Sequence, residues 1–224
     1  MGRVQSAENK PSTAKTAALC KTALLCLVSG LLNTLVSYVI NGVCGLPLYF
    51  DTLFTVAVYF SAGLLPALAT AVLLPVFTTF EYTWLMGLHI ETAWWTYLFV
   101  FCVIFEVLLV FAFRKKIKPL DSDFRKEPSF FNFVNLAPLL MLVVVFDCMT
   151  VSVIGGIIDF ILTLLKAPKA FYPEDSFKLG LLRNNVPVLA TAILSRIPIN
   201  IMDRFFVIFG GYGVSLLYRK IINR

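Results

Sequence analysis

Long apolar segments dominate the chain, and only short polar stretches separate them. The clearest lie near residues 18–43, 93–113, 134–165 and 187–218. A membrane-spanning helix needs roughly 17–25 such residues, and each segment is long enough. They run on without the two-residue alternation of a membrane β-barrel strand, as in "LVVVFDCMTVSVIGGIIDFILTLL". Because backbone polar groups in lipid must be satisfied within the chain, the pattern predicts an all-α integral membrane protein.

The stretch 52–84 is ambiguous, because it fits either one long helix or two shorter helices that turn near Gly63-Leu64-Leu65-Pro66. A single crossing would leave Arg114, Lys115 and Lys116 outside the cell, against the rule that basic residues collect on the cytoplasmic side. Two crossings place 13 of the 19 Lys and Arg residues inside. These are Arg3, Lys10, Lys15, Lys21, Arg114, Lys115, Lys116, Lys118, Arg125, Lys126, Arg219, Lys220 and Arg224.

We therefore predict a single membrane domain, residues 1–224, with six transmembrane helices and both ends in the cytoplasm. The predicted spans are 18–43, 52–63, 65–84, 93–113, 134–165 and 187–218, the second and third being unusually short. Short apolar segments interrupted by Gly or Pro also point to a binding site in transporters. We expect a multi-pass protein of the inner or plasma membrane.

Composition agrees with this assignment. The chain is 59% hydrophobic and 14% charged, with a mean hydropathy of +0.85, whereas soluble domains are roughly 45–50% apolar and about 25% charged. The net charge of +6 comes from basic residues at the ends of apolar segments, so it does not indicate nucleic acid. The five cysteines form no CxxC pair and favour apolar packing. Residues 1–16 lack the apolar core of a signal peptide, so we expect no cleaved leader.

A ridge of small residues runs along the first span at a spacing of four. Its members are Ala14, Ala18, Thr22, Cys26, Gly30 and Thr34. Positions four apart share one helix face, and small side chains there let another helix approach closely. The ridge serves either packing within the chain or docking of a partner membrane protein, for which we single out the first five residues.

Charged residues inside spans are costly and usually paired or functional. Here they are Glu106, Asp147, Asp159, Arg196, Asp203 and Arg204. Counted along their helices, Asp147 and Arg196 both fall near the bilayer midplane, which predicts an ion pair between them. The same argument pairs Glu106 with Arg204. Such pairs either specify packing, relay protons or contact a ligand.

Aromatic and acidic residues cluster in the outer segment "FEYTWLMGLHIETAWW". The substrate-binding candidates there are Glu81, Tyr82, Trp84, His89, Glu91, Trp94 and Trp95. This cluster is either an aromatic belt at the membrane interface or a pocket in which aromatic faces stack on a flat ligand and carboxylates orient it. Asp51, which either caps a helix or joins the site, completes the candidates on that side with Asp159, Asn184 and Asn185.

Catalytic motifs are missing from the sequence. His89 is the only histidine, which is too few for a metal site, and no nucleophile with a base accompanies it. There is no phosphate-binding P-loop. We expect neither an enzyme nor a cofactor, and any ATP hydrolysis would belong to other subunits.

Two segments carry a resemblance to a known family. "GLPLYFDTLFTVAVYFSAGLLPALATAVL" (45–73) looks like the loop and the short second and third helices of the substrate-binding S components of energy-coupling factor (ECF) vitamin transporters. "LSRIPINIMDRFFVIFGGYGVSLLYRKI" (194–221) is similar to the last helix of many members. The likeness in length and topology covers nearly the whole chain.

The resemblance implies a six-helix protein that captures a vitamin or micronutrient from outside. Its partners would be a transmembrane coupling subunit and cytoplasmic ATPases, with membrane lipid around it. Family members meet the coupling subunit through an Ala-x-x-x-Ala pattern in the first helix, which Ala14-Lys15-Thr16-Ala17-Ala18 matches. The loop from Gly42 to Tyr49 would act as a lid.

Two other functions remain open from sequence. The first is a membrane sensor or interaction protein, although only about six residues follow the last span and leave no room for an output domain. The second is a stand-alone secondary transporter, membrane enzyme or assembly factor, in which Asp147, Glu106 and Arg196 would handle protons or ions.

Overall fold

A computed structural model describes residues 10–85, 87, 94–165 and 175–222, and this part of the chain is helical without strands. Four helices are long and apolar enough to cross a membrane: Thr16–Val43, Tyr97–Lys126, Phe130–Leu164 and Val188–Ile222. Two shorter apolar helices accompany them, Leu53–Ala62 and Leu64–Phe80. The prediction of an all-α membrane protein is confirmed.

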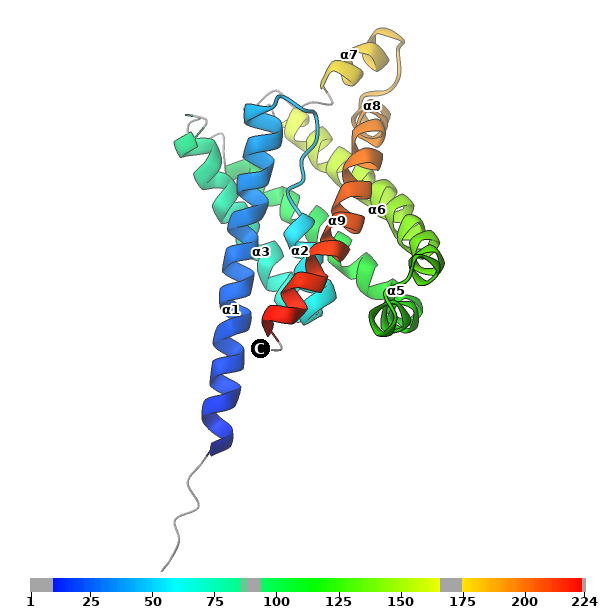
Figure 1. Ribbon diagram of the computed structural model, residues 1–224. Helices are drawn as coiled ribbons and strands as arrows, with labels where there is room; N and C mark the ends of the chain where they lie inside the picture. The colour runs from blue at the N-terminus through cyan, green and yellow to red at the C-terminus, as the bar shows by residue number, and fades with distance from the viewer. Residues whose placement is uncertain (1–9, 86, 88–93, 166–174, 223–224) are drawn as a thin grey trace, which may run out of the picture.

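The helices match the predicted spans in part (Figure 1): the span predicted at 187–218 is divided between Val188–Leu194 and Ile197–Ile222, and the one predicted at 93–113 continues to Lys126. In order, they are α1 (Lys10–Ser37) with the π-helical η1 (Tyr38–Val43), α2 (Leu53–Ala62), α3 (Leu64–Phe80) with η2 (Glu81–Leu85), η3 (Trp94–Phe99), α5 (Val100–Lys126), α6 (Phe130–Leu164), α7 (Asp175–Arg183), α8 (Val188–Leu194) and α9 (Ile197–Ile222). The ambiguous stretch 52–84 forms two helices. Gly63, with a φ of 95°, separates them, because glycine adopts this backbone conformation without a Cβ clash.

The short helix α2 lies at the centre of the structure and packs against α1, α3 and α9. Its residues Val56, Ala57 and Val58 are fully buried. A Cβ on Gly211 of α9 would lie 2.8 Å from the carbonyl oxygen of Leu53 and 2.9 Å from Val56 Cβ. The absence of a side chain at Gly211 therefore lets the two backbones approach.

The start of α2 is held by α1. None of its own side chains caps the helix, although the first N–H groups of a helix have no partner within it. Asn33 of α1 supplies one, because its Oδ1 accepts from the Phe54 N–H at 2.7 Å. The Asn33 Nδ2 donates to Thr55 Oγ1 at 2.8 Å. This amide, fully buried, ties two apolar helices together at a defined register.

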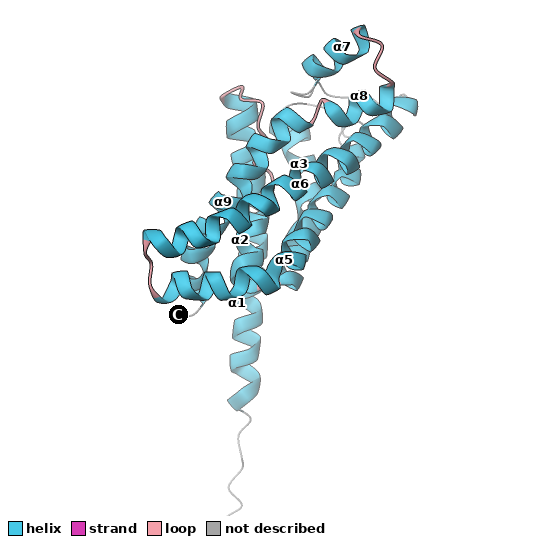
Figure 2. Ribbon diagram, turned by 90° about the vertical axis from the view of Figure 1, so that its right-hand side faces the viewer, coloured by secondary structure: helices cyan, strands magenta, loops and turns pink. Residues whose placement is uncertain are grey.

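The small-residue ridge on α1 divides into two parts. Gly30 faces α3, where a Cβ would lie 2.8 Å from the Phe77 ring, and the Cys26 thiol donates to the Pro66 carbonyl at 3.4 Å. Cys26 and Gly30 therefore pack within the chain, and their role in docking a partner stays a prediction. The N-terminal part of α1 extends beyond the other helices (Figures 1 and 2), and Ala18 there is exposed.

The glycine pair Gly155-Gly156 lies within a continuous helix. α6 continues from Phe130 to Leu164 as one 35-residue helix. A Cβ on Gly156 would lie 2.8 Å from the Ile193 Cα, and one on Gly155 would lie 2.9 Å from an Arg196 Nη1. The glycines make room for α8 and for Arg196, which lies in the break between α8 and α9.

Gly211 offers a test of this close packing. Gly211→Ala places a methyl group against the α2 backbone, so we expect it to destabilise the protein by about 1–3 kcal/mol. Gly213→Ala on the same helix is the matched control, because nothing lies within 4 Å of its added Cβ. Thermal unfolding in detergent measures both. Equal melting temperatures for the two variants would refute the close approach.

Candidate functional site

The loop before α2 is fastened to α9 by one carboxylate. Asp203 Oδ1 accepts the backbone N–H groups of Tyr49 and Phe50, each at 2.9 Å. Phe50 has a φ of 52°, which is uncommon for a residue other than glycine, and its ring stacks on Phe206 at 5.5 Å. The predicted lid, from Gly42 to Tyr49, is thus fixed to α9 at its C-terminal end.

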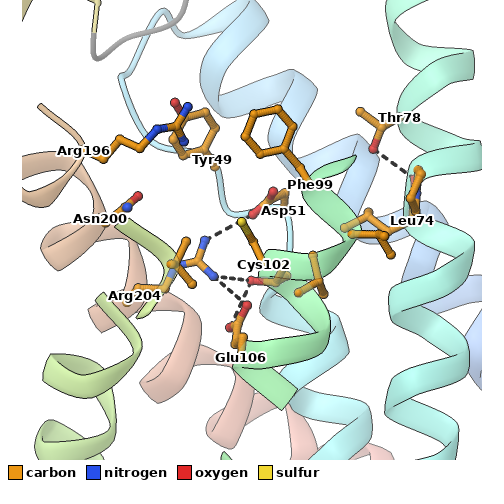
Figure 3. A pocket seen from close by; sticks show the side chains of 15 residues that line it. Tyr49, Asp51, Leu74, Thr78, Phe99, Cys102, Glu106, Arg196, Asn200 and Arg204 are labelled. Carbon is orange, nitrogen blue, oxygen red and sulfur yellow. Dashed lines mark hydrogen bonds and ion pairs between the residues drawn. The ribbon is translucent and has the colours of Figure 1, made fainter. Parts of the chain in front are cut away.

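Next to Asp203, the guanidinium of Arg204 uses all of its N–H groups. Figure 3 shows its position between Asp51 and Glu106. Nε and Nη2 donate to Asp203 Oδ2 at 3.1 and 2.5 Å. Nη2 also donates to Asp51 Oδ1 at 3.3 Å. Nη1 donates to Glu106 Oε2 at 2.7 Å and to Thr52 Oγ1 at 2.9 Å. The predicted Glu106–Arg204 pair is confirmed.

The planar guanidinium explains why arginine occupies this position. Arg204 is 3% exposed, and burying a charge is costly unless hydrogen bonds and opposite charges compensate it. Five N–H donors in a fixed fork meet acceptors from three parts of the chain: the loop, α5 and α9. Thr52 extends the network, since its hydroxyl donates to Glu106 Oε1 at 3.1 Å.

The predicted pair between Asp147 and Arg196 is not formed. Asp147 is fully buried, yet neither of its carboxylate oxygens has a hydrogen-bond partner. The Arg196 guanidinium instead lies 5.4 Å from the centre of the Phe99 ring, in a cation–π contact. The pair was predicted because both residues lie at a similar depth along their helices. Arg196, however, lies in the break between α8 and α9, and its side chain occupies the space at Gly155.

A cavity of about 110 Å³ opens between these groups, several times the roughly 10–15 Å³ that one water molecule needs. Its charged and polar lining consists of Asp51, Thr52, Thr78, Glu106, Arg196, Asn200 and Arg204. Tyr49, Phe99 and Cys102 also line it, and Figure 3 shows the side chains of Tyr49 and Phe99 on the side of the cavity away from Glu106. Two carboxylates and two guanidinium groups thus line one partly aromatic cavity.

Among the predicted substrate-binding residues whose side chains the structure describes, only Asp51 lines this cavity. Trp84 is 77% exposed and stacks on Phe80. Trp95 packs on a small apolar cluster around Cys102. Asp159 pairs with Lys178 of α7 at 2.5 Å. The exposed side chains of Asn184 and Asn185 lie in the turn after α7, and Asn184 donates to the Gly180 carbonyl.

Glu81 lies just beyond α3 and is 2% exposed. It does not line the cavity. Of the other candidates, His89 and Glu91 lie outside the described residues, as do the side chains of Tyr82 and Trp94.

The sequence pattern did not indicate several of the lining residues, among them Tyr49, Phe99, Cys102 and Asn200. Tyr49 and Phe99 are ordinary aromatics in apolar surroundings, and Cys102 has the appearance of a core residue. Asn200 was the most detectable, because an amide inside an apolar span needs a partner. It donates to Ser152 Oγ of α6 at 2.9 Å.

Arg204→Lys tests the fork. Lysine keeps the charge but has a compact ammonium that cannot reach acceptors on three segments. We expect a loss of about 1–3 kcal/mol of stability, the cost of leaving a buried acceptor without a donor, seen as a lower melting temperature. Arg183→Lys on α7, where the side chain is exposed, is the control. An unchanged melting temperature for Arg204→Lys would show that the fork is dispensable.

Comparisons with known proteins do not assign the chain to a family. No family model, no curated protein and no solved structure matches it. Function resides in a site rather than in a fold, so the function is inferred from the residues around Arg204.

Proposed function

We propose that this chain is the substrate-capture subunit of an ATP-driven vitamin or micronutrient importer. The supporting observation is the cavity in which Asp51, Glu106, Arg196 and Arg204 meet inside an otherwise apolar helical protein. Charged groups within a membrane protein usually mark a substrate or ion site. A concave site with a few converging polar groups is the usual form of a small-molecule site.

The lining favours a small ligand with polar groups and a flat ring. Tyr49 and Phe99 offer aromatic faces, which stack on planar heterocycles. Arg196 is suited to an anionic or carbonyl group, because guanidinium groups donate two parallel hydrogen bonds. Asp51, 38% exposed at its side chain, is suited to a donor group. We propose a neutral or zwitterionic aromatic ligand.

The proposed topology has six spans, with the cavity toward the outer face and both ends in the cytoplasm. The separation of α2 from α3 at Gly63 supports it, because two crossings by these short helices keep the basic residues of α5 inside. The lid loop would then open to the exterior.

The proposed partners are a transmembrane coupling subunit and cytoplasmic ATPases. The extension of α1 beyond the other helices supports this proposal (Figures 1 and 2), because it offers a helix surface that the chain itself leaves open. Ala18 is exposed there and Thr22 is partly exposed. The side chain of Ala14 lies outside the described residues.

One observation favours a second candidate, a stand-alone secondary transporter. Asp147 is fully buried, and both of its oxygens lack a hydrogen-bond partner. A buried polar group of this kind calls for an explanation, and proton handling is one. Uptake by the chain alone, driven by a proton gradient, would favour this candidate, whereas uptake that requires ATP and partner subunits would exclude it.

Ligand retention tests the primary proposal. We expect native mass spectrometry of the protein, purified from its own membrane, to detect a bound small metabolite. Arg196→Gln should weaken retention about tenfold or more, because a hydrogen bond to a charged group contributes about 1.5–3 kcal/mol. Arg183→Gln should leave retention unchanged. If the folded protein never carries a small molecule, the proposal fails.

Sidedness is tested separately by cysteine labelling in a variant whose native cysteines are replaced. We expect Asn185→Cys to react with a membrane-impermeant maleimide in intact cells. Lys116→Cys should react only after the cells are permeabilised. Both side chains are exposed, so accessibility reports the side of the membrane. The reverse pattern would invert the topology and defeat the capture of an external ligand.

A further inference from the structure

A second, larger hollow lies further along α5 from the cavity at Arg204. It has a volume of about 780 Å³ and is formed by the end of α2, the turn at Gly63, the middle of α5 and Arg219 of α9. Arg219 Nε donates to the Phe60 carbonyl at 3.0 Å and Nη1 donates to Asp121 Oδ1 at 2.9 Å. These bonds fix the walls, because they connect α2, α5 and α9.

The hollow is strongly basic. Arg114, Lys115 and Lys118 line it, and all three are exposed. Asp121, the one carboxylate among the described residues of the lining, is already engaged by Arg219 and by Arg125 at 3.1 Å.

The three exposed cations have no acidic partner in the part of the chain that the structure describes. Arg114 rests over the Phe111 ring at 4.7 Å, and no carboxylate of the described residues pairs with Arg114, Lys115 or Lys118. The hollow therefore presents positive charge that an anion from outside the chain can neutralise.

An exposed apolar stripe on α5 leads toward the hollow. Phe101, Phe105 and Leu108 are 50%, 47% and 39% exposed. Their spacing continues through Ala112 to Lys115, and positions three and four apart share a helix face. In a membrane protein this stripe faces acyl chains. An acyl chain along the stripe would therefore bring its headgroup to Lys115.

We propose that this hollow binds the phosphate headgroup of an anionic phospholipid, with an acyl chain lying along the α5 stripe. Basic pockets between transmembrane helices bind such headgroups. Membrane orientation accounts for basic residues at this end of α5, but it does not require them to surround a hollow. The stripe favours a lipid over a soluble phosphate compound, because a soluble compound gains nothing from it. This inference does not depend on the proposed function.

The test compares two double variants of the full chain in nanodiscs of phosphatidylcholine, with and without phosphatidylglycerol. Lys115→Gln with Lys118→Gln removes two charges from the hollow. Lys116→Gln with Lys126→Gln removes two exposed charges from the same helix outside the lining. Native mass spectrometry after release counts the phosphatidylglycerol molecules retained per protein, and melting temperatures confirm that both variants fold.

We expect the wild-type protein to retain phosphatidylglycerol in preference to phosphatidylcholine. The hollow variant should lose this preference by about fivefold for each charge removed, the effect of about 1 kcal/mol per basic residue near a membrane surface. The control should retain it. An equal loss in both variants, or no preference in the wild type, would overturn the proposal. Displacement of the lipid by added inorganic phosphate alone would also overturn it, in favour of a soluble ligand.

Discussion

The burial of Arg204 is the constraint on which the rest of the site depends. A guanidinium that is 3% exposed in an apolar protein must satisfy five N–H groups and one positive charge. Its acceptors come from Asp51 and Thr52 before α2, Glu106 on α5 and the neighbouring Asp203. Satisfying one side chain therefore fixes the loop, α5 and α9 relative to one another and leaves a polar cavity among them.

Close helix packing makes this arrangement possible. Gly211 brings α9 against the backbone of α2, and Gly156 brings α6 against α8. Both contacts exclude a side chain, so the short helices fit inside the protein and their ends stop at the level of the charged residues. Packing by van der Waals contact between small residues is the usual way in which membrane helices associate.

The helix α5 links two polar places of different character. Near its start, Glu106 belongs to the cavity, where carboxylates and guanidinium groups balance. Further along, Lys115 and Lys118 line a hollow whose described residues include more cations than carboxylates. The cavity suits a small ligand of mixed charge, and the hollow suits an anion. The helix α5 therefore connects the proposed capture site with the proposed lipid contact.

The sequence alone determined the helical membrane class, the break near Gly63 and the pairing of Glu106 with Arg204. Long apolar runs permit few alternatives in lipid, and a charge within such a run must find a partner. Only the tertiary structure decided that Arg196 turns away from Asp147 and that Cys26 and Gly30 face α3. It also decided that Asp51, rather than Trp84 or Trp95, meets the charged residues. These outcomes depend on helix breaks and on the direction of each face, because a residue's depth along its own helix does not specify which neighbour it meets.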